Sequence, residues 1–513
     1  MDVSYRSLNT RETVSLTIGA VRPSTLVVLM AICQIVAWTL APSLTHSSPP
    51  LDAVEGYMWG REWVLATYKH PAMPSWVLEA SRLTTGVVGW PAYLAGQLFV
   101  AATFMFVYLL GRDLLGPHRA AAGVLLMCGI AFYAWPTTEF NHNVAEMPFW
   151  AAVAWAMWRA VESQRRVWWM LVGAFAAAGM YAKLTTALLL ITLICWMLWD
   201  GKARQRLATS GPWIAVLTFA VLVLPLAQWL IGHNFLPLRY GVSRAEMAQG
   251  GALRFVATLL ITAVGLFIVM GIGGLIRLRA PRHLATSAPT PDHKTTIATR
   301  ANHYLMALTG GPIALTLMAA ASSGLALKVA WGSSMLNLAG LLAVALTSHN
   351  FTEKALGRIV ACALVLLVVL PLGYAVVVLS WPWRGGRPMR ANWPQAEISS
   401  RFTDLWKTQT GQPLKIVSGD AWIAGLVGIT AADQPSILSG PLPSASPWIT
   451  PERLEREGML VVWNAKRRKM PHYVQRHIAS IPVGQERFRW SAAPKSEDLV
   501  IEYALVLPQR LQR

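Results

Sequence analysis

Long apolar segments alternate with short polar ones over the first three-quarters of the chain. Segments of this length can cross the hydrocarbon core of a membrane as helices, and we predict about eleven of them. The predicted spans are residues 24–44, 91–111, 119–136, 145–161, 167–182, 184–199, 212–232, 253–276, 304–321, 335–348 and 359–380. The fold class predicted from this pattern is an α-helical polytopic membrane protein.

The pattern changes after residue 383 to that of a water-exposed domain. Alternating apolar and β-branched residues predict short strands, and helical spacing of apolar residues predicts two helices. The predicted strands and helices are residues 414–417, 459–463 and 499–505, and 394–409 and 451–457. We therefore expect a membrane domain over residues 1–383 and a small C-terminal α/β domain over 384–513.

Composition and charge agree with a membrane protein. Of the 513 residues, 54% are hydrophobic and 13% are charged, whereas about a quarter of a soluble domain is charged. The net charge of +19 would suit a nucleic-acid partner, but Lys and Arg concentrate in alternate loops, as the positive-inside rule requires. We therefore predict no nucleic-acid partner, a cytoplasmic N-terminus, and a first loop and C-terminal domain on the opposite side. The four cysteines lack the spacing of a zinc site or a disulfide framework.

The first loop, residues 45–90, combines acids, bases and tryptophans beside a membrane face. Its pattern predicts one amphipathic helix after Asp52 and another after Pro74, both lying on the membrane. Trp59, Trp63 and Trp76 are expected at the level of the lipid headgroups. Such helices can frame a cleft that opens to both lipid and water.

Asp52 and Glu55 in this loop have two possible roles. Asp52 could be the N-cap of a helix, with Glu55 at the third position of a capping box. Alternatively, a carboxylate at the mouth of the cleft could act as a general base. The two roles are compatible.

Lys69, His70 and Pro71 form a second polar unit in the first loop. A phosphate leaving group needs positive charge or hydrogen-bond donors where its charge develops, and Lys69 and His70 supply both. The alternative is a lysine whose charged end reaches the surface, next to a surface histidine in a turn.

The loop after the third span contains Glu139, Asn141, His142 and Asn143. These side chains could bind sugar hydroxyls or a divalent cation, with Glu139 and His142 as the candidate metal ligands. Alternatively, Asn141 and its neighbours simply cap the helix that follows.

Four further cations are predicted on the same side of the membrane as the first loop. Lys183 interrupts an otherwise apolar double segment, and an ionisable residue at such a place is a functional candidate, although a lysine that reaches the interface is an alternative. Arg239, Arg244 and Lys328 lie in later loops. They are candidates for binding a lipid phosphate, or they are ordinary flanking charges.

Together these motifs resemble the polyprenyl-phosphate-sugar glycosyltransferases of the protein mannosyltransferase and aminoarabinose transferase superfamily. The resemblance rests on Asp52-x-x-Glu55-x-Tyr57-x-Trp59-Gly60 and Tyr68-Lys69-His70-Pro71, with Phe140-Asn141-His142-Asn143 and Lys183-Leu184-Thr185 similar to the bacterial branch. It covers residues 24–380. The chain departs from the family pattern where Ala53 and Val54 separate the acidic pair and where Ala72 replaces a second proline.

The resemblance implies a GT-C fold and inverting transfer of a sugar from a polyprenyl-phosphate donor to a lipid or glycan acceptor of the cell envelope. It implies a bacterial inner-membrane protein whose active site and C-terminal domain are periplasmic, in contact with membrane lipid. A divalent cation is a possible cofactor. The catalytic residues would be Asp52 and Glu55. The substrate-binding candidates are Tyr57, Arg61, Tyr68, Lys69, His70, Asn141, His142, Asn143, Lys183, Arg239, Arg244 and Lys328.

The alternative function is a transporter or flippase of a lipid-linked sugar. Such a protein should carry its site near the middle of the bilayer, between two halves with broken helices. Here the polar residues gather on one face, and a folded outer domain follows them. This distribution favours an enzyme that works on one side of the membrane.

Overall fold

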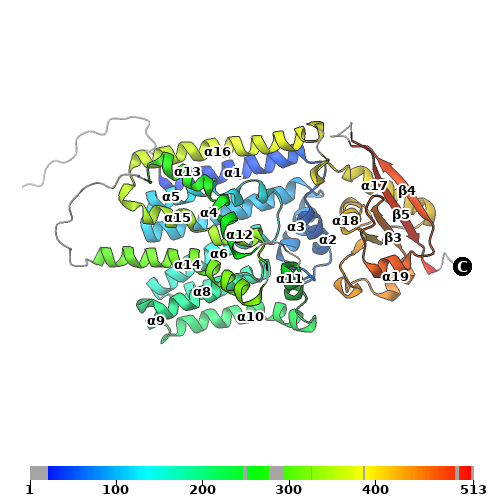
Figure 1. The fold of residues 1–513 in the computed structure, drawn as a ribbon. Helices are drawn as coiled ribbons and strands as arrows, with labels where there is room; N and C mark the ends of the chain where they lie inside the picture. Colours follow the sequence, from blue (N-terminus) through cyan, green and yellow to red (C-terminus); the bar gives the residue numbers. More distant parts are fainter. Residues whose placement is uncertain are drawn as a thin grey trace, which may run out of the picture.

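The computed structural model describes residues 21–246, 251–276, 293–324, 326–384, 387–490 and 496–509. The polar residues before the first predicted span, 1–20, lie outside this range. A long helical bundle makes up most of the molecule, and a small domain with a β-sheet lies at one end of it (Figure 1). This arrangement places the first loop between the bundle and the sheet domain.

Five helices in the described ranges are long and apolar enough to cross a membrane. They are α1 (Pro23–Thr45), α4 (Trp90–Leu115), α10 (Ser210–Gly232), α14 (His293–Ser323) and α16 (Glu353–Ser380). Two bent helix pairs raise the number to as many as seven. The chain is therefore a multi-pass membrane protein, but the predicted number of about eleven spans is not confirmed.

The predicted continuous helix over 119–136 is wrong. Helix α5 (Pro117–Leu126) is followed by a chain of 3-10 turns as far as Thr138, bent by 86°. Irregular backbone at membrane depth needs polar partners from the protein itself. Gln34 Nε2 donates to the Tyr133 carbonyl at 2.8 Å, and Gln97 Nε2 donates to Thr137 Oγ1 at 2.9 Å. Buried amides from neighbouring helices thus stabilise the break.

Two other predicted spans also differ from straight helices. The segment 253–276 consists of α12 (Ala252–Thr262) and α13 (Val264–Gly273), which are bent by 41°. The segment 335–348 contains only the eight-residue α15 (Ala339–Leu346). At 1.5 Å per residue such a helix is too short to cross the membrane, so the prediction of a span there is wrong.

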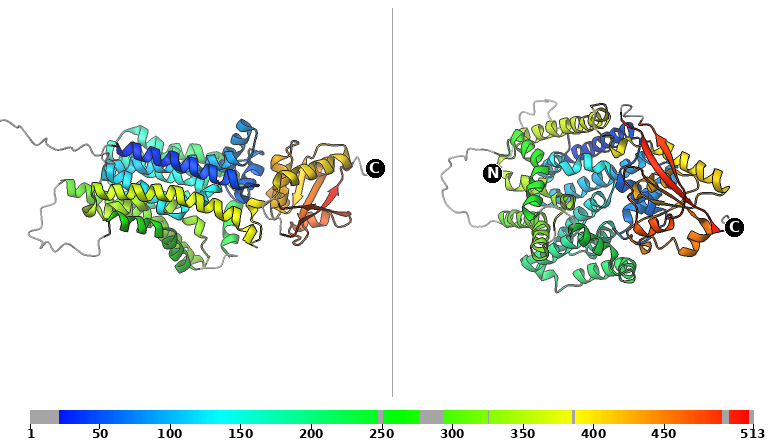
Figure 2. Two further views of the ribbon diagram at one scale, coloured as in Figure 1. Left: turned by 90° about the horizontal axis from the view of Figure 1, so that it is seen from above. Right: turned by 45° about the vertical axis from the view of Figure 1, so that its right-hand side comes forward.

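Three consecutive helices bring polar side chains to the end of the bundle that carries the first loop. They are α6 (His142–Ser163), α7 (Arg166–Ala182) and α8 (Thr186–Trp199). The short helices α9 (Gly201–Arg206) and α11 (Leu236–Glu246) flank α10. Helices α1 and α16 lie side by side along the bundle, as Figure 1 and the left view of Figure 2 show.

The two helices predicted in the first loop are confirmed as α2 (Leu51–Gly60) and α3 (Met73–Thr85). Helix α2 has Pro50 as its N-cap, so Asp52 lies within the first turn, and the predicted capping box is wrong. A side chain at Gly60 would come within 2.2 Å of the Ser75 carbonyl, so glycine is required where α2 meets α3.

The tryptophans of the first loop do not share one environment. Trp63 is 53% exposed, whereas Trp59 is only 2% exposed and packs inside the protein. Trp76 is half-buried, and its Nε1 donates to the Val64 carbonyl at 2.8 Å. The prediction that Trp59 lies among lipid headgroups is therefore wrong, because its ring packs against Tyr68 and Lys69 beside a cavity.

The C-terminal residues form a five-stranded sheet with the strand order β2-β1-β3-β5-β4. Strands β1, β2 and β3 are parallel, and β5 is antiparallel to both β3 and β4. The strands are β1 (Ile416–Gly419), β2 (Ser436–Leu438), β3 (Met459–Asn464), β4 (Val483–Phe488) and β5 (Leu499–Val506). The helices are α17 (Gln395–Thr410), α18 (Ala421–Thr430), α19 (Pro451–Glu457) and α20 (His472–His477).

All three predicted strands and both predicted helices of this part are confirmed, as β1, β3, β5, α17 and α19. Strands β2 and β4 were not predicted. Strand β2 has only three residues, and β4 lies at the edge of the sheet with mostly exposed or half-buried residues. Neither therefore shows the apolar pattern of a buried strand.

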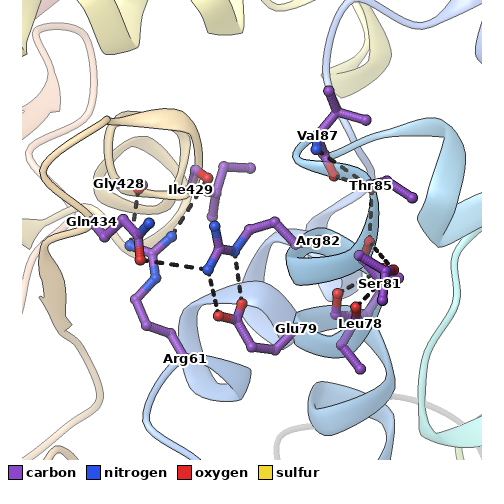
Figure 3. Close-up of polar contacts among 12 residues, drawn as sticks. Arg61, Leu78, Glu79, Ser81, Arg82, Thr85, Val87, Gly428, Ile429 and Gln434 are labelled. Atoms are coloured by element: carbon purple, nitrogen blue, oxygen red, sulfur yellow. Dashed lines mark hydrogen bonds and ion pairs between the residues drawn. The ribbon is translucent and has the colours of Figure 1, made fainter.

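Helix α18 attaches the sheet domain to the first loop. A side chain at Gly425 would come within 2.5 Å of Val54 on α2, which shows how closely α18 approaches α2. Arg61 Nη1 donates to the carbonyls of Gly428 at 3.1 Å and Pro435 at 3.0 Å. Nearby, Arg82 pairs with Glu79 (Figure 3). The C-terminal domain thus holds α2 in place from outside.

Candidate active site

A cavity of about 550 Å³ lies under α2 at the end of the bundle that carries the first loop. Its walls come from α2, the turn after Tyr68, the start of α6, the α7–α8 junction, α11 and the segment after α14. Its charged and polar lining includes Asp52, Glu55, Lys69, His70, His142, Asn143, Lys183, Arg244 and Lys328. Most of the residues predicted for the site therefore meet in one place.

Five predicted substrate-binding residues do not line the cavity, for a different reason in each case. Arg61 is held by the C-terminal domain, and Tyr57 is fully buried in α2. The Tyr68 ring packs edge-on against Trp59, behind Lys69. Asn141 lies behind Asp52, and Arg239 is exposed on α11.

Asp52 is oriented by residues of the loop before α6. Asn141 Nδ2 donates to Asp52 Oδ2 at 2.9 Å, while Asn141 Oδ1 accepts hydrogen bonds from the backbone of Asn143 and Val144. The predicted capping role of Asn141 is therefore confirmed. The same side chain fixes one oxygen of the Asp52 carboxylate.

A second carboxylate, Glu139, lies behind Asp52. Glu139 Oε1 accepts a hydrogen bond from the Asp52 backbone N–H at 2.8 Å and so satisfies a free donor in the first turn of α2. Burial and the Asp52 carboxylate raise the pKa of Glu139 to about 7, although this N–H and the charge of Arg390 lower it. Glu139 can therefore carry a proton near neutral pH.

Glu55 is bound to Lys69 rather than free. Lys69 Nζ donates to Glu55 Oε1 at 2.5 Å and lies 5.5 Å from the centre of the Trp59 ring and 5.7 Å from that of Tyr240. Burial lowers the pKa of Lys69, but the Glu55 carboxylate together with Tyr68 and Tyr240 outweighs burial and keeps the pKa above its ordinary value. Lys69 is therefore a fixed positive charge in the cavity wall.

Lys183 is held in the same way at the α7–α8 junction. Its Nζ donates to Asn143 Oδ1 at 2.8 Å and to Glu146 Oε1 at 3.1 Å. Thr185 Oγ1 donates to the other oxygen of Glu146 at 2.8 Å. Because Lys183 is buried and bound to α6, the alternative of a lysine that reaches the interface is wrong.

Two histidine rings, His70 and His142, pack against each other at a tilt of 35° in the wall of the cavity. The ring centres of His70 and His142 are 4.0 Å apart, and His142 Nε2 donates to the Pro71 carbonyl at 3.1 Å. Burial, followed by the nearby positive charges, lowers the pKa of His70 well below its ordinary value. A neutral His70 can exchange hydrogen bonds with a ligand without adding charge.

The described residues contain no group of three or more His, Cys, Asp or Glu side chains that could hold a metal ion. Glu139 lies behind Asp52, and it does not line the cavity as His142 does. The two candidate metal ligands therefore do not both line the cavity.

Arg244 and Lys328 line the opposite wall, and neither has an ion-pair partner among the described residues. Arg244 is exposed on α11, and Lys328 is half-buried before Val329. Burial and the charge of Arg244 lower the pKa of Lys328. The Asp52 carboxylate also acts on Lys328, but neither cation is ion-paired within the part of the chain that the structure describes, so the two form a place for an anion.

Comparisons with known proteins agree with this geometry. Residues 69–229 match the family model of dolichyl-phosphate-mannose-protein mannosyltransferases. The chain is 23% identical over 438 residues to the lipopolysaccharide core galacturonosyltransferase RgtA of Rhizobium johnstonii, and the match covers 83% of each chain. The match to this glycosyltransferase relative therefore extends well beyond the residues that match the family model.

Solved structures of ArnT from Cupriavidus metallidurans are similar over almost their whole length. The structure bound to undecaprenyl phosphate has a TM-score of 0.62 and 12% identity, covering 94% of this chain and 98% of that one. The apo structure has a TM-score of 0.61 and 13% identity over the same shares. The chain is a glycosyltransferase with the GT-C fold. The predicted fold class and enzyme class are confirmed, and the transporter alternative is set aside.

The site of this glycosyltransferase also contains residues that were not predicted. Glu146 is fully buried against Lys183, and Tyr240 faces Lys69 from α11. Glu146 is an acid within a predicted apolar span, and such a residue is a functional candidate. Tyr240 shows no comparable pattern, because only the fold brings α11 beside the first loop.

Proposed function

We propose that this glycosyltransferase moves a sugar from a polyprenyl-phosphate donor to a cell-envelope acceptor such as lipid A, its core sugars, or another glycolipid or glycan. The undecaprenyl phosphate of the ArnT structure and the lipopolysaccharide core substrate named for RgtA support this substrate class. The single observation that carries the proposal is the cavity itself, in which Asp52 faces a set of cations.

We place the protein in the bacterial inner membrane, with the cavity and the C-terminal domain on the periplasmic side. The support is the distribution of Lys and Arg along the sequence. Residues 1–383 would form the membrane-embedded glycosyltransferase domain, and residues 384–513 the periplasmic domain that holds α2.

The donor phosphate would bind between the two charged walls of the cavity. Lys69 and Lys183 are fixed by their carboxylates, whereas Arg244 and Lys328, which also line the cavity, have no ion-pair partner in the described ranges. The prenyl chain would lie against the apolar part of the lining, which includes Leu188, Leu238 and Trp331. Positive charge placed where the phosphate leaves stabilises the developing negative charge.

Asp52 would be the general base. Its backbone and one carboxylate oxygen are held by Glu139 and Asn141, whereas Glu55 is bound to Lys69. In an inverting displacement the acceptor oxygen bonds to C1 of the sugar as the bond from C1 to the phosphate oxygen breaks. The acceptor proton passes to Asp52, and the polyprenyl monophosphate leaves. Glu55 supports this step by keeping Lys69 in place.

The test is Asp52→Asn in the purified full-length protein, with a polyprenyl-phosphate sugar as donor. A general base contributes about 10²–10⁴-fold in rate, so we expect a loss of that size in the release of polyprenyl phosphate. Donor binding and the melting temperature should change little. The matched control is Asp404→Asn on the exposed surface of α17. Wild-type turnover in Asp52→Asn would remove Asp52 from the mechanism.

A further inference from the structure

The segment that joins α16 to α17 carries exposed tryptophans and arginines. Trp381 is 49% and Trp383 is 57% exposed, directly after the end of the membrane helix α16. Arg384, Arg387 and Arg390 are exposed as well. Among the described residues, none of these three arginines has an ion-pair partner. Tryptophan at this position suits the headgroup layer, and unpaired arginine suits anionic headgroups.

The inner end of this segment is fixed to the first loop close to Asp52. The Ser47 backbone N–H donates to the Ala391 carbonyl at 2.7 Å, a few residues before α2 begins. The Arg390 guanidinium lies 5.4 Å from the centre of the Trp422 ring, at the start of α18. Its charge also acts on the carboxyl of Glu139. Arg390 therefore lies beside the carboxylates, and it is held there by both the bundle and the sheet domain.

Arg390 lies near Asp52 but outside the lining of the donor cavity, and its charge acts on both Glu139 and Glu55. Neither Arg390 nor Glu139 is among the residues that line the cavity, whereas Asp52 is. Glu139 contacts Asp52 from the side of α16, where it also acts on Tyr374. Asp52 thus lies near two groups of cations, one that lines the cavity and one on the exposed segment after α16. In a two-substrate transfer the donor and the acceptor must both reach the base, so the second group of cations is available to the acceptor.

We infer that Arg384, Arg387 and Arg390, flanked by Trp381 and Trp383, form the binding surface for the phosphorylated headgroup of a glycolipid acceptor. This inference rests on the proposed function and assigns the acceptor's approach to the α16 side. The tryptophans hold the surface at headgroup level, and Arg390 binds a phosphate so that a sugar hydroxyl reaches Asp52. The positive charge of this surface is complementary to the negative charge of a phosphate, since residues 381–396 contain arginines but no acid.

The experiment measures lipid binding by the full-length protein in nanodiscs made of a zwitterionic lipid. The probes are lipid A with two phosphates, its dephosphorylated form, phosphatidylglycerol and polyprenyl phosphate. We compare Arg390→Ala with Arg468→Ala, because Arg468 is also exposed and lies at a similar distance, 5.3 Å, from the Trp463 ring. A triple variant also replaces Arg384 and Arg387 by alanine.

We expect Arg390→Ala to weaken binding of the phosphorylated lipid A about tenfold, as for the loss of a charge-assisted contact, and the triple variant to weaken it further. Arg468→Ala should bind as the wild type does, and polyprenyl phosphate should bind equally to all variants. Unchanged affinity of Arg390→Ala for phosphorylated lipid A would overturn the inference. An equal loss of affinity for phosphatidylglycerol would also overturn it, because the surface would then be a general membrane anchor. An equal loss of affinity for polyprenyl phosphate would overturn it as well, because Arg390 would then contact the donor.

The same measurements separate this inference from the proposed function. A wild-type protein that binds no polyprenyl phosphate would overturn the proposed function. Wild-type binding of polyprenyl phosphate, with no effect of Arg390→Ala on lipid A, would overturn the inference alone.

Discussion

The two charged walls of the cavity are built on different principles. On one wall, Lys69 and Lys183 are each held by a carboxylate, Glu55 and Glu146 respectively. On the other wall, Arg244 and Lys328 face the cavity without such partners among the described residues. The paired wall therefore supplies fixed geometry, and the unpaired wall supplies positive charge that a bound anion can neutralise.

The difference follows from burial. The side chains of Lys183 and Glu146 are 6% and 0% exposed, and a buried charge without a partner costs several kcal/mol. Arg244 and Lys328 keep contact with the cavity opening and can be solvated until a ligand arrives. The fold can thus leave cations unpaired only where water reaches them.

The largest effect should come from breaking the buried pair. Lys183→Met leaves the Glu146 carboxylate buried without its ion partner, which should lower the free energy of unfolding by about 3–5 kcal/mol. The measurement is thermal unfolding in detergent. The control is the double variant Lys183→Met with Glu146→Gln, which removes both charges and should recover much of the stability. A single variant as stable as the wild type would contradict the role of this pair.

A smaller and different effect is expected on the unpaired wall. Arg244→Ala or Lys328→Ala should weaken polyprenyl phosphate binding about tenfold each, because a charge-assisted contact is lost, with little change in melting temperature. Arg239→Ala is the matched control, since Arg239 lies on the same helix outside the cavity. If all three variants bind polyprenyl phosphate equally well, the unpaired wall is not the phosphate site.

The smallest effect concerns Glu139, a carboxylate behind Asp52 that has no ion-pair partner among the residues that the structure describes. Its pKa is about 7 in the folded protein, raised from 4.5, so the folded state binds this proton more tightly than the unfolded state. Stability should therefore fall as pH rises from about 4.5 to about 7. Glu139→Gln keeps an acceptor for the Asp52 N–H and should remove this contribution.

The measurement is the melting temperature of both proteins in detergent at about pH 5 and about pH 8. The wild type should lose a few degrees more than Glu139→Gln as the pH rises. An equal change in the two proteins would show that the Glu139 proton does not contribute. If the melting temperature of Glu139→Gln fell more with rising pH than that of the wild type, the raised pKa assigned to Glu139 would be contradicted.

Elements that depend on local pattern were predicted well. The first-loop helices α2 and α3 and the strands β1, β3 and β5 were predicted from the spacing of apolar residues over short windows. Such spacing reflects which side of a single helix or strand is buried, and a short window of sequence is enough to show it. The break after α5 was not predicted, because its composition is as apolar as that of a continuous span.

The contacts of that break explain why the composition did not reveal it. A side chain at Gly129 would come within 2.4 Å of the Gly265 backbone, so the turn is formed where two distant segments touch. Gln34 and Gln97 then supply the hydrogen bonds that a continuous helix would make within itself. None of these partners is near residue 129 in the chain.

The sequence by itself determined which side chains are available to the site and on which side of the membrane they are expected, because charge and apolar length control insertion. Only the tertiary structure decided that Glu55 is bound to Lys69, that Glu146 holds Lys183, and that Arg61 serves the domain interface. The physical reason is that a buried charge takes the partner that packing brings within a few ångströms, and packing joins segments that are far apart along the chain.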